Sequence, residues 1–138
     1  MKSHSKIITM KTTQKEEAVD ITGLVSEALL ESSITDGIAL VFPLHTSCAV
    51  YISDSERGLQ EDLSLILSSL VPEGKGYLHD SSDPKLNARG HLRAVLTGHH
   101  IVVPVSEGNL ELGAYGTIYY AEFDGQREKE VLVKIIGQ

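Results

Sequence analysis

Histidines at the ends of predicted elements are the side chains best suited to chemistry in this sequence. His45 opens the triplet His45-Thr46-Ser47, directly after a predicted buried strand. His79 ends a polar loop, and His91 lies on a predicted helix 12 residues further along. Polar residues that follow a rigid element are often held open to a cleft. Three neutral imidazoles brought together there would bind a transition metal, with zinc as the default choice.

Other interpretations of these residues stay open at this point. The intervals between the three histidines match no local ligand motif, so three unrelated surface or cleft histidines are the alternative. Ser47 lacks the Gly-x-Ser-x-Gly context of a nucleophile. Cys48 lies among apolar neighbours and is predicted to be a core residue. His99 and His100 follow a predicted helix end, where the macrodipole favours a cation and explains them without function.

Charged and amide side chains accompany the histidines. Asn87 and Arg89 precede His91, within a stretch from residue 75 to residue 100 that carries a net charge of +2. Glu122, Asp124 and Arg127 bracket a predicted hairpin turn, where a solvated surface ion pair would be worth little. These residues become candidates for a site only if the fold brings them to the histidines.

The first half of the chain is expected to alternate short strands with two helices. Strands are predicted over residues 7–10 and 18–21, paired as a hairpin, and over residues 38–42 and 48–52. The run 38–42 is apolar on both faces and predicts a central strand. Thr22 is expected to cap the first helix, and Asp54 or Ser55 the second, whose apolar stripe runs from residue 59 to residue 70.

The second half is predicted to contain one helix followed by strands. Ser82-Asp83-Pro84 is a helix-start signal, and the helix should close at Gly98. Strands are predicted over residues 101–105, 110–112, 118–123 and 131–136, with Asp124-Gly125 as the strongest hairpin signal. Strands and helices mix without a regular βαβ repeat, which favours an α+β fold.

Composition narrows the class of protein. The 138 residues fit a single domain over 1–138, with residues 1–5 expected as a flexible arm. A formal charge of -7 argues against nucleic-acid and anionic-membrane binding. Cys48 is the only cysteine, and neither a signal peptide nor a membrane span is visible, so we expect a cytoplasmic protein.

Five separated landmarks together resemble the YjbQ-like family, whose members were long uncharacterised and of which some are called secondary thiamine-phosphate synthase enzymes. The landmarks are His45-Thr-Ser-Cys-Ala49, His79-Asp80, Asn87-Ala-Arg-Gly-His91-Leu92, Leu110-Glu-Leu-Gly113, and Glu122-Phe-Asp-Gly125 with Arg127. The resemblance implies an α+β fold with a mixed, curved sheet and about three helices, a homotrimer, and a histidine-rich cleft near a subunit boundary. It also places Asp54 where members usually carry a glutamate.

The chain departs from the family after Leu112-Gly113. Members usually continue with Thr-Trp-Gln, whereas this chain has Ala114-Tyr115-Gly116. The glutamine is missing and the aromatic side chain is smaller, so the ligand preference of this member could differ from that of its relatives.

Three functions follow as hypotheses. The first is a thiamine-phosphate synthase type of transfer, joining a pyrimidine diphosphate to a thiazole phosphate with release of pyrophosphate, in which magnesium would accompany the diphosphate. The second is a metal-dependent hydrolase with zinc on His45, His79 and His91. The third is a trimer that binds a small phosphorylated molecule or a metal without turnover. The expected catalytic residues are His45, Asp54, Glu122 and Arg127, and the expected substrate-binding residues are Thr46, Ser47, Asn87, Arg89, Gly113 and Tyr115.

Overall fold

Eight strands and three α-helices follow one another in the computed structural model, which describes residues 1–138. Their order is β1 (Lys2–Met10), β2 (Glu17–Asp20), α1 (Thr22–Ser32), β3 (Gly37–Pro43), β4 (Cys48–Ser53), α2 (Arg57–Leu70), the 3-10 helix η1 (Leu78–Ser81), α3 (Ala88–Thr97), β5 (Ile101–Ser106), β6 (Asn109–Leu110), β7 (Thr117–Glu122) and β8 (Lys129–Gly137). None of these helices combines the length and the apolar character that a bilayer-spanning helix requires.

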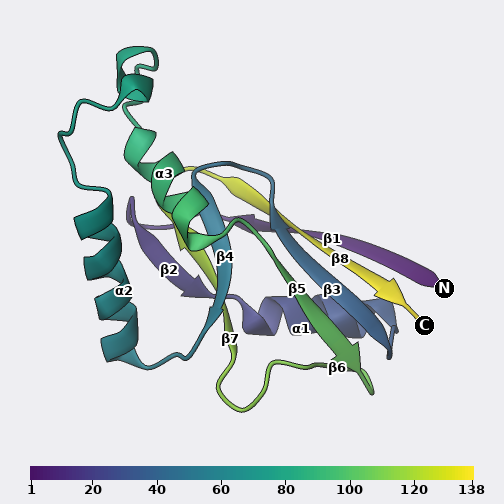
Figure 1. Ribbon diagram of the computed structural model, residues 1–138. Coiled ribbons are helices and arrows are strands. Elements are labelled where there is room, and N and C mark those ends of the chain that lie inside the picture. The colour runs from purple at the N-terminus through teal and green to yellow at the C-terminus, as the bar shows by residue number, and fades with distance from the viewer.

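The strands form two sheets, and the α+β class with three helices is confirmed. One sheet has the order β1-β8-β3-β5-β6 and the other the order β2-β7-β4 (Figure 1). Every strand pair is antiparallel, so the expectation of a mixed sheet is wrong. β3 lies between β8 and β5, which confirms the central strand predicted from its two apolar faces.

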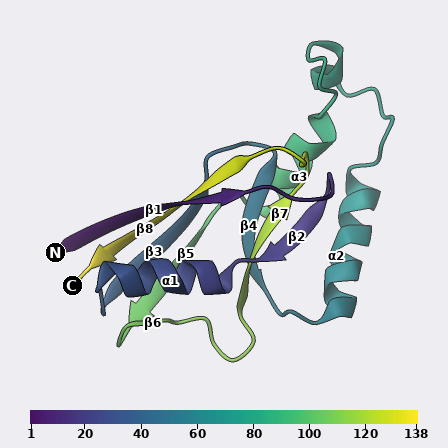
Figure 2. The same cartoon turned by 180° about the vertical axis from the view of Figure 1, so that it is seen from behind.

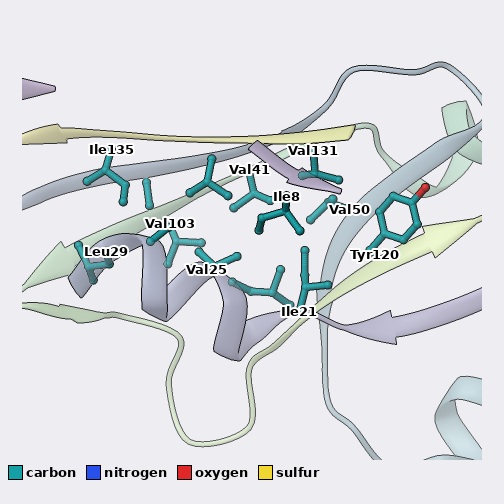
Figure 3. Packing of buried hydrophobic residues seen from close by; sticks show 14 of the residues in the cluster. Ile8, Ile21, Val25, Leu29, Val41, Val50, Val103, Tyr120, Val131 and Ile135 are labelled. Atoms are coloured by element: carbon teal, nitrogen blue, oxygen red, sulfur yellow. The ribbon is translucent and has the colours of Figure 1, made fainter. Parts of the chain in front are cut away.

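The main core lies between α1 and the two sheets (Figure 3). Val25 and Leu29 project from α1 into a cluster with Val41 of β3, Val103 of β5 and Tyr120 of β7. Cys48 is fully buried in the same cluster, as predicted. A smaller apolar cluster on the other face of the three-stranded sheet packs α2 and α3 against β4 and β7. The three-stranded sheet is therefore packed on both faces.

The N-terminus is part of the sheet and does not form the predicted hairpin. The segment expected as a flexible arm belongs to β1, in which Lys2 pairs with Gly137 of β8. β2 pairs with β7 in the other sheet. The two chain ends consequently lie side by side (Figures 1 and 2). Local sequence signals favoured a short-range pairing, but each strand finds a more distant partner.

Helix starts differ from the predicted caps for identifiable reasons. Thr22 Oγ1 accepts a hydrogen bond from the Ile118 N–H, at 2.9 Å, and so does not cap α1. Glu56 caps α2 by accepting from two backbone N–H groups, in place of Asp54 or Ser55. α3 begins at Ala88 because Leu86 adopts a left-handed φ of 52°, which interrupts a helix started at Pro84.

Asp124-Gly125 connects the two sheets and does not close a hairpin. β7 belongs to the three-stranded sheet and β8 to the five-stranded sheet, so the strands on either side of the turn are not paired. The Gly125 N–H donates to Lys15 O at 2.9 Å, and a Cβ at this position would lie 2.3 Å from Thr12 Oγ1. Glycine therefore permits the close crossing, which carries Glu122 and Arg127 to the junction of the sheets.

Candidate functional site

A buried ion pair forms the base of the candidate site. Lys129, the first residue of β8, donates to Glu122 Oε2 and, at 2.8 Å, to Ser47 Oγ. Lys129 and Glu122 are each 1 % exposed. The Tyr120 hydroxyl donates to the second carboxylate oxygen, Glu122 Oε1, at 2.7 Å. Burial and this hydrogen bond raise the pKa of Tyr120, so the hydroxyl stays protonated as a donor. Both carboxylate oxygens are thus paired, as a buried charge requires.

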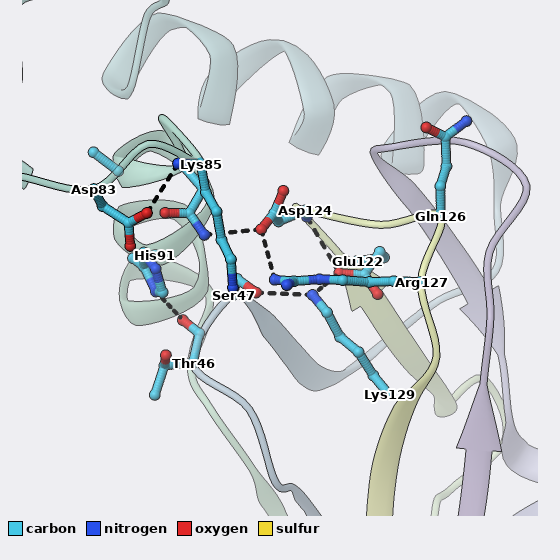
Figure 4. Close-up of polar contacts among 12 residues, drawn as sticks. Thr46, Ser47, Asp83, Lys85, His91, Glu122, Asp124, Gln126, Arg127 and Lys129 are labelled. Atoms are coloured by element: carbon cyan, nitrogen blue, oxygen red, sulfur yellow. Dashed lines mark hydrogen bonds and ion pairs between the residues drawn. The ribbon is translucent and has the colours of Figure 1, made fainter. Parts of the chain in front are cut away.

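A chain of hydrogen bonds runs from His79 through Asn87 and Asp124 to Arg127, and Figure 4 shows its last link, between Asp124 and Arg127. His79 Nε2 lies 2.9 Å from Asn87 Oδ1, Asn87 Nδ2 donates to Asp124 Oδ2 at 2.8 Å, and Arg127 donates to the same oxygen at 2.8 Å. The amide orientation follows from Asp124, which can only accept. Asn87 Oδ1 therefore faces His79 and accepts from Nε2–H, which leaves His79 Nδ1 free.

His91 is fixed in a similar way. Its Nδ1 lies 3.1 Å from the carbonyl oxygen of Thr46. A carbonyl oxygen only accepts, so Nδ1 carries the hydrogen and Nε2 is free. The rings of His79 and His91 are 4.8 Å apart and nearly perpendicular. Two imidazoles, each with one defined free nitrogen, therefore share this part of the site.

His45 is oriented differently. Its Nε2 accepts a hydrogen bond from the Glu130 N–H at 3.0 Å, which places the hydrogen of the neutral ring on Nδ1. Burial, followed by the charge of Lys129, lowers the pKa of His45. Neither ring nitrogen of His45 then has a lone pair free to bind a metal. No three His, Cys, Asp or Glu side chains of this chain are placed to hold one metal ion. The predicted convergence of His45 with His79 and His91 on a metal is thus not found.

Arg89 and Ser47 are tied to protein groups. Arg89 donates to Val71 O at 2.9 Å and pairs with Glu16 at 2.6 Å and Glu73 at 3.3 Å. It lines a cavity of about 310 Å³ that also reaches Asn87. Ser47 is buried against Lys129, whereas Thr46 is exposed and offers its carbonyl to His91. The substrate-binding roles expected of Arg89 and Ser47 would require these contacts to be exchanged.

Three predicted site residues lie away from the others. Asp54 follows β4, whereas Ser47 precedes it, and a six-residue strand spans about 20 Å. Asp54 is exposed and accepts from the Glu56 N–H at 3.0 Å. Gly113 and Tyr115 precede β7, at the end opposite to Glu122, and Tyr115 is 76 % exposed. Within one chain, these three residues lie away from the histidines.

Lys129, Asp124 and Tyr120 are the site residues that sequence reasoning missed. Lys129 occupies an inward position of β8, in step with the buried Val131 and Val133. A lysine in the inward register of an alternating strand is a signal that could have identified it. Asp124 was visible only as a turn residue, because its role depends on Asn87, 37 residues earlier.

A second, larger cavity lies apart from the histidines. It has a volume of about 640 Å³ and lies between α2 and the three-stranded sheet. Arg93 lines it, is 2 % exposed and pairs with Glu16 at 2.8 Å, and Glu16 in turn also holds Arg89. The cavity is lined by apolar as well as charged groups, among them Leu63 and Tyr51.

Comparisons with known proteins agree with one another. A family model described as "UPF0047 protein YjbQ-like" matches residues 6–138. A UPF0047 protein of Archaeoglobus fulgidus is 46% identical over 94% of this chain and 98% of its own length. The UPF0047 protein YugU of Bacillus subtilis is 30% identical over 96% of this chain and 98% of its own.

Solved structures show the same architecture. The crystal structure of a YbjQ-like protein of unknown function from Sulfolobus solfataricus has a TM-score of 0.93 with 34% identity, over 99% of both chains. A YjbQ/UPF0047 protein from Clostridium acetobutylicum has a TM-score of 0.87 with 32% identity, over 95% of this chain and 99% of its own.

Proposed function

Because the chain belongs to the UPF0047 YjbQ-like family, we propose that it binds a small phosphorylated molecule beside Arg127, His79 and His91 and acts on it as a transferase. The observation that carries this proposal is the hydrogen-bonded chain from His79 through Asn87 and Asp124 to Arg127. It fixes one guanidinium and one imidazole relative to each other before any ligand arrives, which lowers the cost of binding.

Arg127 supplies the anion-binding group. One terminal nitrogen donates to Asp124, while the side chain is 45% exposed. A guanidinium has five N–H donors in a planar fork that matches phosphate oxygens, so donors remain for a ligand. Lys85 also lies on this side of the site (Figure 4). Positive side chains are thus available locally in a chain with a formal charge of -7.

His79 and His91 supply acid–base groups. Each has one nitrogen fixed as a donor to the protein and the other free to face a ligand. A neutral imidazole takes up a proton at the free nitrogen, and the protonated ring returns it to a leaving oxygen. Their rings lie 4.8 Å apart, so both can reach one small molecule.

The reaction class we propose is the thiamine-phosphate synthase type suggested by the family resemblance. The bond between the pyrimidine methylene carbon and the diphosphate oxygen breaks, a bond from that carbon to the thiazole nitrogen forms, and pyrophosphate leaves. Arg127 would stabilise the charge that develops on the leaving group, and His79 or His91 would protonate it. Magnesium, when bound with the diphosphate, would offset further negative charge.

Pyrophosphate binding tests the anion site. We expect Arg127→Met to weaken pyrophosphate binding, measured by isothermal titration calorimetry, by about tenfold to a hundredfold, the value of a charged hydrogen bond. Arg57→Met is the matched control, because Arg57 lies on α2 and its side chain is 92% exposed. Equal affinities in the wild type and Arg127→Met would overturn the proposed anion site.

Turnover tests the transferase separately. Wild-type protein incubated with the two thiamine precursors and magnesium should release pyrophosphate and form thiamine phosphate, and His91→Gln should reduce the rate by about a hundredfold or more. Binding of the precursors without turnover would leave the non-enzymatic ligand-binding function and reject the transferase.

One observation favours a metal-dependent hydrolase as the second candidate. Metal-bound histidines usually donate their other ring N–H to a carbonyl or carboxylate oxygen, and His79 and His91 donate to an amide oxygen and a backbone carbonyl. Zinc would then bind these two residues without His45. Elemental mass spectrometry on untagged protein tests this, because zinc should be lost in both His79→Gln and His91→Gln.

The homotrimer is proposed on the basis of the resemblance and of exposed apolar side chains. Val95 of α3 is 77 % exposed, and Leu65 and Leu70 of α2 are 67 % and 63 % exposed. A large exposed apolar patch is typical of a surface that packs against another chain, and in the proposed trimer these side chains would contribute to one. Light scattering coupled to size exclusion should give three times the 15.0 kDa of one chain. A monomeric mass would reject the trimer.

A further inference from the structure

Two adjacent histidines at the junction of α3 and β5 form a cluster apart from His79 and His91. His99 Nδ1 lies 3.3 Å from His100 Nδ1. His99 Nε2 lies 3.2 Å from the carbonyl oxygen of His45, which can only accept. His99 therefore carries its hydrogen on Nε2, and the lone pair of its Nδ1 is directed at the neighbouring ring and accepts from His100 Nδ1–H.

The helix macrodipole, by which the sequence analysis explained His99 and His100, does not account for this arrangement. A cation at a helix end is stabilised when it lies near the last carbonyl groups. Neither histidine ring is hydrogen-bonded to a carbonyl of α3, and the Gly98 N–H closes the helix by bonding Ala94 O at 3.1 Å. The rings turn instead toward His45 and toward each other.

The nitrogen separation matches a tetrahedral metal. Two nitrogens that each lie 2.0–2.1 Å from a tetrahedral zinc are about 3.3–3.4 Å apart. Square-planar coordination at the same bond length would require about 2.9 Å. The 3.3 Å between His99 Nδ1 and His100 Nδ1 therefore suits zinc better than planar copper(II).

The surrounding residues hold both rings in place. Phe42 packs edge-on against His99 with ring centroids 4.6 Å apart and lies 5.0 Å from His100. The backbone is fixed as well, since the Val50 N–H donates to His99 O at 3.1 Å. His99 is half-buried, whereas His100 is exposed, so an ion from solvent can reach the pair. The His99 ring is therefore held by its neighbours before an ion binds.

We propose that His99 and His100 form a two-histidine site for a zinc-class divalent cation, bound through both Nδ1 atoms. Without metal, His100 Nδ1–H donates to His99 Nδ1. On binding, the His100 hydrogen moves to Nε2, so both rings remain neutral and no proton is lost from the pair. Water or an anionic ligand completes the tetrahedron. The contact from His99 to the His45 carbonyl is the outer-shell bond usual for a metal-bound histidine.

Zinc titration of untagged full-length protein, treated first with a chelator, tests the proposal. Calorimetry should show one zinc per chain at this pair, with affinity reduced by more than about tenfold in His100→Gln. His4→Gln is the matched control, because His4 lies on β1 and belongs to neither group of histidines, and it should keep this binding. His99→Gln should also lose it, and circular dichroism checks that each variant keeps the wild-type fold.

Nitrogen-15 spectra of the histidines identify the ligating atom. Zinc should shift Nδ1 of His99 and His100 and leave Nε2 of both rings protonated. Unchanged zinc affinity in His100→Gln would overturn the proposal, as would zinc binding that is lost in His91→Gln alone. Neither result bears on pyrophosphate binding at Arg127, so the two proposals fail independently.

Discussion

The two ends of the paired strands β4 and β7 differ in the burial and hydrogen bonding of their polar side chains. At one end, Ser47 and Glu122 are buried and bonded to Lys129, with Asn87 and Asp124 connected just above. At the other end, Asp54 and Tyr115 are exposed. Their only side-chain hydrogen bond is local, in which the Glu56 N–H donates to Asp54 Oδ1. The first end buries a connected set of polar side chains within one chain, whereas the side chains of Asp54 and Tyr115 belong to no such set.

This difference shows which residues can form a site within a single chain. Buried polar groups must be paired, so each contact at the first end fixes the next, and the free nitrogens of His79 and His91 are the outcome. Nothing fixes Asp54 or Tyr115 relative to them. A residue can therefore be predicted from the sequence as part of the site and still lie outside the site of its own chain.

Among the substitutions that test this comparison, loss of the buried Lys129 should change the free energy of unfolding most. Lys129→Met leaves Glu122 buried with an unpaired charge, and we expect the free energy of unfolding to fall by about 3–5 kcal/mol. Urea denaturation measures the change. Lys134→Met on the same strand is the control, because Lys134 is exposed and should change the value by less than about 0.5 kcal/mol.

A second substitution separates the charge from the packing. Glu122→Gln combined with Lys129→Met removes the unpaired charge and should recover much of the lost stability. If the double variant were as unstable as the single one, packing around Lys129 and not the ion pair would hold this end together.

Asn87 is the next strongest test, because its amide links His79 to Asp124. Asn87→Ala leaves two polar partners without their hydrogen bonds in a position that is 5% exposed, so the free energy of unfolding should fall by about 1–3 kcal/mol. Pyrophosphate affinity should fall as well, since Asp124, the partner of Arg127, would lose the hydrogen bond from Asn87. Reduced stability with unchanged affinity would mean that the amide supports the fold but does not organise the site.

How much of this structure the sequence predicts depends on how far apart along the chain the contacting residues lie. The central β3 and the strands after residue 100 follow from apolar runs that any partner would bury. The pairing of β1 with β8 was missed because its partners lie more than 100 residues apart. The Asp124-Gly125 turn was recognised, but local signals cannot show that the strands beside it join different sheets.

The site follows the same logic. His79, Asn87 and His91 were found from their residue types, and the structure brings them together. The tautomers of His79 and His91 could not be predicted from the sequence, because these depend on Asp124 and on the Thr46 carbonyl. The failed metal triad has the same origin, since the contact from the Glu130 N–H to His45 is long-range.

His45 makes a smaller contribution that depends on pH. Its pKa is lowered in the folded state, so the unfolded chain takes up this proton first as the pH falls below about 6.5. Stability from His45 is therefore complete above that pH and is lost on acidification toward the folded pKa, with a slope of at most about 1.4 kcal/mol per pH unit. His45→Gln should flatten the stability curve between pH 7 and 5. Parallel curves for the two proteins would contradict this assignment.

Tyr115 should give the smallest effect, and it tests the exposed end directly. Its side chain is 76 % exposed, so Tyr115→Ala should change the free energy of unfolding by less than about 0.5 kcal/mol. Pyrophosphate affinity should also stay unchanged, because β7 separates Tyr115 from Glu122 and Arg127 in the same chain. Calorimetry and urea denaturation on the same samples measure both. Lower affinity with wild-type stability would instead mean that another copy of the chain brings its exposed end to this site, because no contact within one chain could transmit the loss.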